Sequence, residues 1–182
     1  MDDRRRRFEA QVLPHLDAAY RFARRLARSS PDDADDVVQE AVLRAYRGFD
    51  ALRGSDVKVW LLTIVRNCYS TSLKQQQRRA QVPLPEEHDT QDGHALIATT
   101  PDPESASIRR DEEHTLESLI GGLSDDYREV LILREIEDMR YREIAAVTNL
   151  PMGTVMSRLA RARSVLKEHW LLQASGEPHA ML

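Results

Sequence analysis

The chain has 182 residues and a formal net charge of −4, and 41% of its residues are hydrophobic while only 5% are aromatic. This length and composition allow one domain or two small ones with aliphatic cores. The single cysteine, Cys68, excludes intramolecular disulfides and a cysteine-based zinc site, and the histidines lack metal-ligand spacing. The sequence shows no signal peptide and no stretch of membrane-spanning length, which predicts a soluble cytoplasmic protein without direct membrane insertion.

The net charge hides an uneven distribution of charged residues along the chain. Residues 1–79 hold 16 Lys and Arg against 11 Asp and Glu, whereas residues 80–108 hold six carboxylates and no Lys or Arg. Residues 109–182 hold 10 Lys and Arg against 13 Asp and Glu. Local basic surfaces therefore coexist with an acidic strip, so the net charge does not exclude a nucleic-acid partner.

The first helical stretch has apolar residues at helical spacing from Phe8 to Leu26, and no convincing alternating strand pattern appears anywhere in the chain. We expect Pro14 to kink or restart this helix, because proline removes a backbone hydrogen bond inside it. The run from Arg4 to Arg7 precedes the apolar pattern and is expected to be disordered.

The second predicted helix begins at Ser30 and Pro31, a capping residue and a first-turn proline, and ends near Gly48. Its predicted buried side consists of Ala34, Val37, Val38, Ala41 and Ala45. Leu43 projects in the opposite direction, among Asp36, Gln39, Glu40 and Arg47. An apolar residue ringed by polar groups is typical of a protein-binding hot spot, although a solvated face with a stray leucine has the same pattern.

A third helix is predicted from residues 57 to 79 after a loop at 49–56. Its predicted buried stripe consists of Val57, Trp60, Leu61, Ile64 and Cys68. A polar arc beside the stripe contains Thr63, Arg66, Asn67, Ser70 and Lys74. These groups can donate to phosphates and base edges without a competing carboxylate, although a solvated helix end looks similar. Trp60 and the preceding loop, with Arg53, could also hold an extruded base.

Residues 80–104 differ in kind from the rest, because they contain prolines and six carboxylates but no cation and few large apolar side chains. Such a segment buries too little surface to offset its ordering entropy, which predicts a flexible linker. The predicted architecture is therefore all-α, with helical domains at 8–79 and 105–170 joined by this acidic linker.

The second domain is predicted to begin with a helix from 104 to 120 that is followed by two glycines. Ser124 then caps a helix over 125–138. Residues 141–167 predict two helices joined by a tight turn, in which Asn149 adopts the left-handed conformation and Pro151 starts the second helix. This is the outline of a helix-turn-helix.

The second helix of this motif is cationic and amphipathic. Its apolar stripe consists of Val155, Leu159, Ala162 and Leu166, and Ser157, Arg161 and Ser164 project on the opposite side. Residues 153–167 carry four cations and no carboxylate, which favours a polyanionic partner. The same cations could instead merely keep a terminal helix soluble.

Three motifs resemble a known family: DADDVVQEAVLRAYRGF, VWLLTIVRN and LSDDYREVLILREIEDMRYREIAAVTNLPMGTVMSRLARAR. They are similar, in order and spacing, to regions 2 and 4 of extracytoplasmic-function (ECF) sigma factors of bacterial RNA polymerase, in the sigma-70 superfamily. The resemblance covers nearly everything except the linker and both tails. It implies a subunit that binds core RNA polymerase and directs transcription initiation at promoters with minus-10 and minus-35 elements.

The resemblance also implies three sets of site residues. The set expected to bind the β′ clamp helices of core polymerase is Asp35, Asp36, Gln39, Glu40, Leu43 and Arg47. The set for minus-10 DNA is Arg53, Trp60, Thr63, Arg66, Asn67, Ser70 and Lys74. The set for minus-35 DNA is Thr154, Met156, Ser157, Arg158, Arg161, Arg163 and Lys167. The resemblance further implies a contact with the polymerase β flap and control by an anti-sigma factor.

Two positions depart from the family pattern. Thr71 stands where many members have Asp, and Met156 stands where many have Arg or Lys. The promoter sequence therefore cannot be copied from a relative. The linker, at roughly 25 residues, has a reach of about 85 Å when extended, which exceeds the about 50 Å between elements one and a half duplex turns apart.

Other functional classes have less support in the sequence. No Gly-rich phosphate loop, metal-ligand set or nucleophile-base pattern predicts an enzyme, and we expect no cofactor and no small-molecule substrate. An autonomous helix-turn-helix repressor or activator, binding duplex DNA as a dimer, is the main alternative. A pure interaction protein, in which the basic faces are incidental, is the third.

Overall fold

The computed structural model describes residues 2–27, 31–52, 56–80 and 118–174, and every regular element within these ranges is helical. The helical elements include α1 (Asp2–Val12), η1 (Leu13–His15), α2 (Leu16–Leu26), α3 (Pro31–Gly48), η2 (Phe49–Ala51), α4 (Val57–Ala80), α6 (Asp125–Leu131), η3 (Ile132–Ile136), α7 (Tyr141–Thr148) and α8 (Met152–Ala174). The predicted all-α class is confirmed. Apart from Ala80, which ends α4, the predicted linker lies outside the described residues, as does most of the helix expected at 104–120.

The predicted disorder of the Arg4 to Arg7 run is wrong, because this run lies within helix α1. The Arg4 guanidinium donates to the Tyr46 carbonyl at 2.7 Å, lies 2.9 Å from Asp50 and stacks on the Tyr46 ring at 4.7 Å from its centroid. Phe8 meets the rings of Tyr46 and Phe49 edge to face, with centroids 5.1 and 5.4 Å apart. Long-range contacts with the end of α3 and with η2 therefore hold the first part of α1, before Phe8, which the sequence did not predict to be helical.

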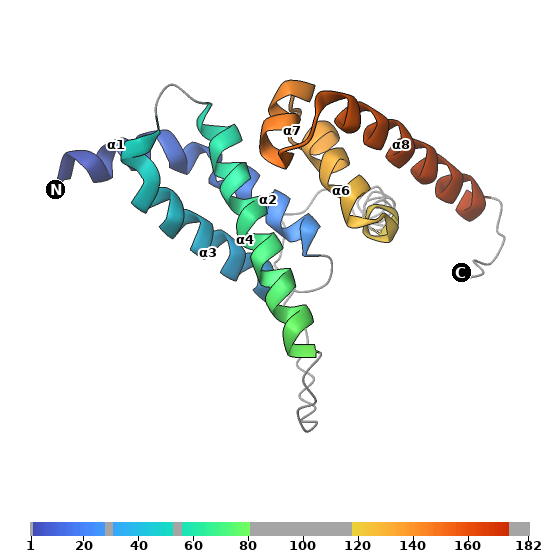
Figure 1. The fold of residues 1–182 in the computed structure, drawn as a ribbon, viewed down its shortest axis with the longest axis horizontal. Helices are drawn as coiled ribbons and strands as arrows, with labels where there is room; N and C mark the ends of the chain where they lie inside the picture. Colours follow the sequence, from blue (N-terminus) through green and yellow to red (C-terminus); the bar gives the residue numbers. More distant parts are fainter. Residues whose placement is uncertain (1, 28–30, 53–55, 81–117, 175–182) are drawn as a thin grey trace, which may run out of the picture.

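Helices α2, α3 and α4 pack against one another beside α1, and together these four helices form the N-terminal unit (Figure 1). The 3-10 turn η1 carries Pro14 and separates α1 from α2, which confirms the predicted break. The five apolar residues predicted on the inner side of α3 are all buried. The small side chains at Ala34, Ala41 and Ala45 allow α3 to approach its neighbours closely.

The predicted buried stripe of α4 is only partly right. Leu61 and Cys68 are buried as expected, but the three other predicted residues are only half-buried. Leu62 and Val65, which the stripe left out, are completely buried. The reason is that α4 is covered on one side by α2 and α3 and on another by α7, so its buried arc is wider than that of a surface helix.

Helices α6, α7 and α8 with the π-helical turn η3 form the C-terminal unit. Ser124 occupies the N-cap position of α6, but its side chain makes no capping hydrogen bond. The helix predicted over 125–138 changes character at η3, where the Glu137 N–H donates to the Ile132 carbonyl at 3.1 Å. Ile132 and Leu133, at the start of this wider turn, are fully buried.

The predicted helix-turn-helix is present as α7, a short turn and α8. Asn149 has φ 54° and ψ 39°, the left-handed conformation expected at that position. Pro151 lies one residue before α8 rather than at its first position, and its carbonyl accepts from the N–H groups of Thr154 and Val155 at 2.9 and 3.1 Å. Of the predicted apolar stripe of α8, Val155, Leu159 and Ala162 are buried and Leu166 is half-buried.

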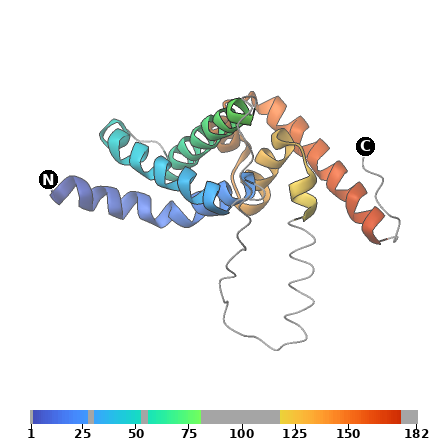
Figure 2. The same cartoon turned by 90° about the horizontal axis from the view of Figure 1, so that it is seen from below.

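The N-terminal and C-terminal units lie directly against each other along a contact that we call the seam. At the seam α4 packs on α7, and α2 packs on α6 and η3, so the two units share one continuous apolar core. Helices α1 and α8 lie toward opposite ends of the molecule, and the seam is between them (Figures 1 and 2).

Candidate polymerase and nucleic-acid interfaces

The outer face of α3 exposes Leu43, with 51% of its surface accessible, as the sequence predicted. Asp35, Asp36, Gln39 and Arg47 are exposed around it. Glu40 is half-buried and accepts a 2.6 Å hydrogen bond from Arg44, a residue that the sequence analysis left out. The i,i+4 spacing of these two residues is a signal that could have identified this pair. The outer face therefore combines one apolar side chain with directional polar groups.

The polar arc of α4 is divided by the seam. Asn67 and Lys74 are exposed, and Ser70 and Trp60 are half-buried. The Thr63 hydroxyl donates to the Val59 carbonyl at 2.8 Å within the helix. Arg53 lies outside the described residues.

Arg66 of the same arc is ion-paired with Glu129 of α6, across the seam. The expectation that no carboxylate competes for this arc is therefore wrong, because the competitor comes from the other unit. Burial raises the pKa of the Glu129 carboxyl, and the hydrogen bond from Arg66 acts in the opposite direction.

The cationic helix α8 is partly neutralised by carboxylates from other elements. Arg158 lies 2.8 Å from Asp126 of α6, and Arg163 lies 2.6 Å from Glu135 of η3. Arg161 is exposed and has no ion pair among the residues that the structure describes. The other members of the predicted minus-35 set are Met156, Ser157 and Lys167, which are exposed, and Thr154, which is half-buried.

The seam also holds a buried carboxylate that the sequence analysis did not identify. The Glu137 side chain is fully buried, and Arg21 donates to both of its oxygens at 3.0 Å. Lys58 Nζ lies 3.1 Å from the same carboxylate and donates to the Glu137 carbonyl at 2.7 Å. Because these partners are 79 and 116 residues away in sequence, no local pattern signals the contact.

Arg128 is completely buried and connects backbone segments of both units. Its guanidinium donates to the carbonyls of Ile120 and Leu123 at 3.2 and 2.6 Å, and to the Leu26 carbonyl of the N-terminal unit at 3.3 Å. Asp125 lies 3.0 Å from the same group. Such a donor can satisfy several buried carbonyls near helix ends at once.

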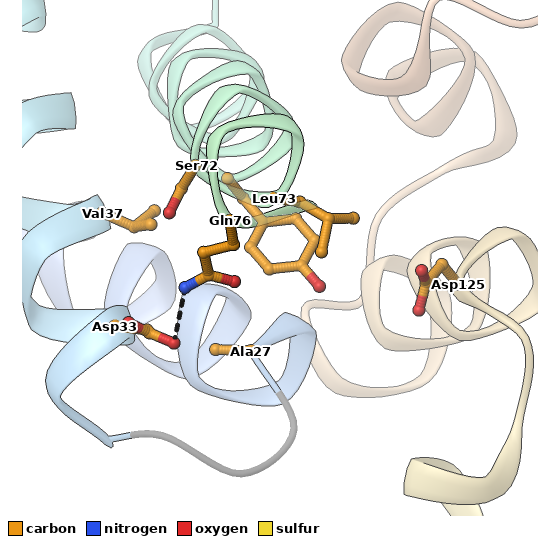
Figure 3. Close-up of a pocket in the computed structure, with 8 residues that line it drawn as sticks. Ala27, Asp33, Val37, Ser72, Leu73, Gln76 and Asp125 are labelled. Carbon is orange, nitrogen blue, oxygen red and sulfur yellow. Dashed lines mark hydrogen bonds between the residues drawn. The ribbon is translucent and has the colours of Figure 1, made fainter. Parts of the chain in front are cut away.

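A cavity of about 220 Å³ lies at one end of the seam. Its lining comes from α2, α3, α4 and α6 and includes Tyr69, Leu73 and Asp125. Gln76 of α4 donates to Asp33 of α3 at 3.0 Å on one wall, and Asp125 of α6 lies on the opposite wall (Figure 3). The two units are therefore less completely packed at this end of the seam.

Other kinds of site find little support in the described parts of the chain. Burial raises the pKa of the Cys68 thiol, which keeps it protonated and unreactive at neutral pH. Within the described ranges, acidic, histidine and cysteine side chains form no group of three or more that could hold a metal ion. None of the helices described is both long and apolar enough to cross a membrane.

Family models match both units of the chain. The model for sigma-70 region 2 matches residues 12–79, and the model for sigma-70 region 4 matches residues 113–166. The first match spans α2, α3 and α4, and the second spans the helix-turn-helix.

Individual relatives agree with these matches. The ECF RNA polymerase sigma-E factor of Escherichia coli K12 is 36% identical over 138 residues, which cover 74% of this chain and 72% of that protein. The solved structure of the sigma factor RpoE with the anti-sigma factor NepR from Bartonella quintana superposes with a TM-score of 0.69 at 29% identity, covering 88% of this chain and 94% of that one. CnrH in complex with the cytosolic domain of CnrY has a TM-score of 0.64 at 27% identity, covering 93% and 90%. The chain therefore belongs to the ECF sigma-factor family of bacterial RNA polymerase.

Proposed function

We propose that this sigma factor divides polymerase binding and promoter recognition among three helices. The outer face of α3 binds core RNA polymerase, α4 holds the minus-10 element, and α8 reads the minus-35 element in the major groove. The observation that carries this proposal is that α3 exposes an apolar side chain among polar groups, while α4 and α8 expose polar and cationic side chains. Sigma factors contribute binding and positioning in initiation, and the protein is not an enzyme.

On α3, Leu43 supplies the apolar contact of the polymerase interface, and Asp35, Asp36, Gln39, Glu40 and Arg47 orient it. A leucine that is half exposed and surrounded by polar groups has the composition of an interface hot spot with a polar rim. The β′ clamp helices are the proposed partner of this face, and the β flap is the proposed partner of the C-terminal unit.

For DNA, the proposed minus-10 contacts are Trp60, Thr63, Arg66, Asn67, Ser70 and Lys74, together with Arg53. The proposed minus-35 contacts are Thr154, Met156, Ser157, Arg158, Arg161, Arg163 and Lys167. Arg161 is the strongest candidate for base or phosphate contact on α8, because it is exposed and pairs with no carboxylate of the residues that the structure describes.

An anti-sigma factor is the proposed regulator of this chain. RpoE of Bartonella quintana, a solved structure similar to this one, is in complex with an anti-sigma factor. A partner that covers the outer face of α3 would block access to polymerase. We further infer that the protein works in the cytoplasm, where its polymerase and promoter DNA are found.

Run-off transcription with purified core polymerase tests the proposed function. The chain should confer initiation at promoters recovered by selecting bound fragments from genomic DNA, and core polymerase alone should not initiate there. If the chain binds duplex DNA tightly without polymerase and confers no initiation, it is an autonomous repressor or activator instead.

A further inference from the structure

The seam is bridged by ion pairs at separate places along its length. Glu137 of the C-terminal unit is fully buried, and both of its carboxylate oxygens are used by Arg21 and Lys58 of the N-terminal unit. Burying a carboxylate is unfavourable unless cations and hydrogen-bond donors compensate it. Glu137 therefore favours a packed arrangement only while both cations are in place.

The second bridge involves a proposed DNA contact. Glu129 of α6 has only 7% of its surface exposed. It pairs with Arg66 of α4, whose side chain is 25% exposed. The N–H donors of the Arg66 guanidinium lie in one plane, and its Nε–H donates to the Glu129 carboxylate. A phosphate would have to compete with this carboxylate for the same guanidinium.

The packed arrangement is also incompatible with reading two promoter elements at once, an argument that rests on the proposed function. Packed helices lie about 8–10 Å apart, and α4 packs directly on α7, the first helix of the helix-turn-helix. Elements one and a half duplex turns apart are separated by about 50 Å. The two units must therefore separate before α4 and α8 can occupy both elements.

We propose that the seam is an autoinhibitory latch, in which Glu137 held by Arg21 and Lys58, and Glu129 held by Arg66, keep the free chain closed and withhold Arg66 from DNA. Opening exposes the seam-facing side of α4 and separates the two DNA-reading helices. The incompletely packed end of the seam, at the cavity beside Gln76 and Asp125, is where the closed arrangement separates most readily.

The test compares the wild-type chain with Glu137→Gln, and with Glu137→Gln combined with Glu129→Gln, in the full-length protein. Asp138→Asn is the matched control, since it removes one carboxylate at the next position, where the side chain is exposed and the backbone has φ 50° that asparagine tolerates. Small-angle X-ray scattering measures the radius of gyration. Fluorescence anisotropy measures binding to a mixed-sequence single-stranded ten-nucleotide DNA without polymerase.

The latch predicts that both Gln variants increase the radius of gyration by several ångströms and tighten DNA binding. If the latch holds nine molecules in ten closed, the apparent Kd falls about tenfold on opening, because affinity is reduced by the fraction of competent molecules. Asp138→Asn should leave both quantities at the wild-type value. Equal tightening in Asp138→Asn would mean that net charge alone is responsible, and would overturn the proposal.

Two further outcomes separate the latch from structural damage and from the proposed function. Arg21→Met should also open the chain, and combining it with Glu137→Gln should open it no further, since both remove the same contact. Unchanged scattering in every variant, with wild-type circular dichroism, would refute the latch. Failure of the wild-type chain to confer run-off transcription would instead refute the proposed function, because the scattering result does not depend on it.

Discussion

Leu43 exposes about half of its surface on α3, and the side chains around it are polar or charged. The apolar surface of an exposed leucine is in unfavourable contact with water. A partner that covers this surface releases the water, which favours binding. The cations of α4 and α8 have more varied surroundings. Arg66, Arg158 and Arg163 are already paired with carboxylates, while Arg161 pairs with none in the described parts of the chain.

Leu43→Asp should abolish binding to core polymerase and leave the fold intact, because the side chain is exposed and a buried carboxylate would disfavour the complex. Leu13→Asp is the matched control, since Leu13 is 48% exposed but lies in η1 rather than on α3. Surface plasmon resonance with immobilised core polymerase measures both variants. Retained binding of Leu43→Asp would contradict the assigned role of this leucine.

Arg161→Ala should weaken binding to the minus-35 element by about 1–3 kcal/mol and relax its sequence preference, if the guanidinium contacts a base. Arg163→Ala should cost less, because Glu135 already neutralises that cation. Competition assays of the polymerase holoenzyme on promoter variants measure both effects. Equal losses on every promoter sequence would show that Arg161 contacts phosphate instead.

At the scale of elements, packing decides which helices form and which of their faces are buried. Helix α1 consists largely of charged residues, yet its Phe8 and Val12 are buried in the core of the N-terminal unit. Helix α4 has an arc of buried residues set by α2 and α3 of its own unit and by α7 of the other. The π turn η3 places Glu137 in the seam and Glu135 beside α8.

Phe8→Ala should lower the free energy of unfolding by about 3–5 kcal/mol, the usual cost of deleting a buried aromatic side chain. Tyr20→Ala, at an aromatic residue that is 37% exposed, should cost about 1 kcal/mol or less. Urea unfolding followed by circular dichroism measures both. Similar small losses in the two variants would mean that α1 is not docked in solution.

At the scale of the whole molecule, the two units are closed over one shared core and several buried charges. The linker between them makes closure intramolecular, so a modest seam is sufficient to hold the units together. A short covalent connection between two binding modules typically supplies an effective concentration in the millimolar range. A latch that must open before both promoter elements are bound has to be weak enough for the two units to separate.

Cutting the linker at a protease site inserted within residues 81–117 should therefore let the two fragments separate at low micromolar concentration. The reason is that cutting removes the effective concentration that the tether supplies. Size-exclusion chromatography of cut and uncut protein measures this. Fragments that still co-elute at 1 µM would indicate a permanent interface, which is too tight for the proposed latch.

The sequence by itself determined the features that depend on neighbouring residues. Helical periodicity, the Asn149 turn and the break at Pro14 placed the helices, and the alternation of faces identified Leu43 as exposed and Val155 as buried. The family motifs identified sigma regions 2 and 4, which the family models match. These signals are local because helix geometry repeats every few residues.

Only the tertiary structure decided which cations are already paired with carboxylates, and which faces of α4 are covered by other helices. Arg66 meets a carboxylate 63 residues away, and Arg21 meets one 116 residues away. Periodicity within one helix cannot show that a distant helix neutralises its cations or widens its buried arc. The physical reason is that Coulomb and packing energies depend on distance in space, which is set by how the two units fold against each other.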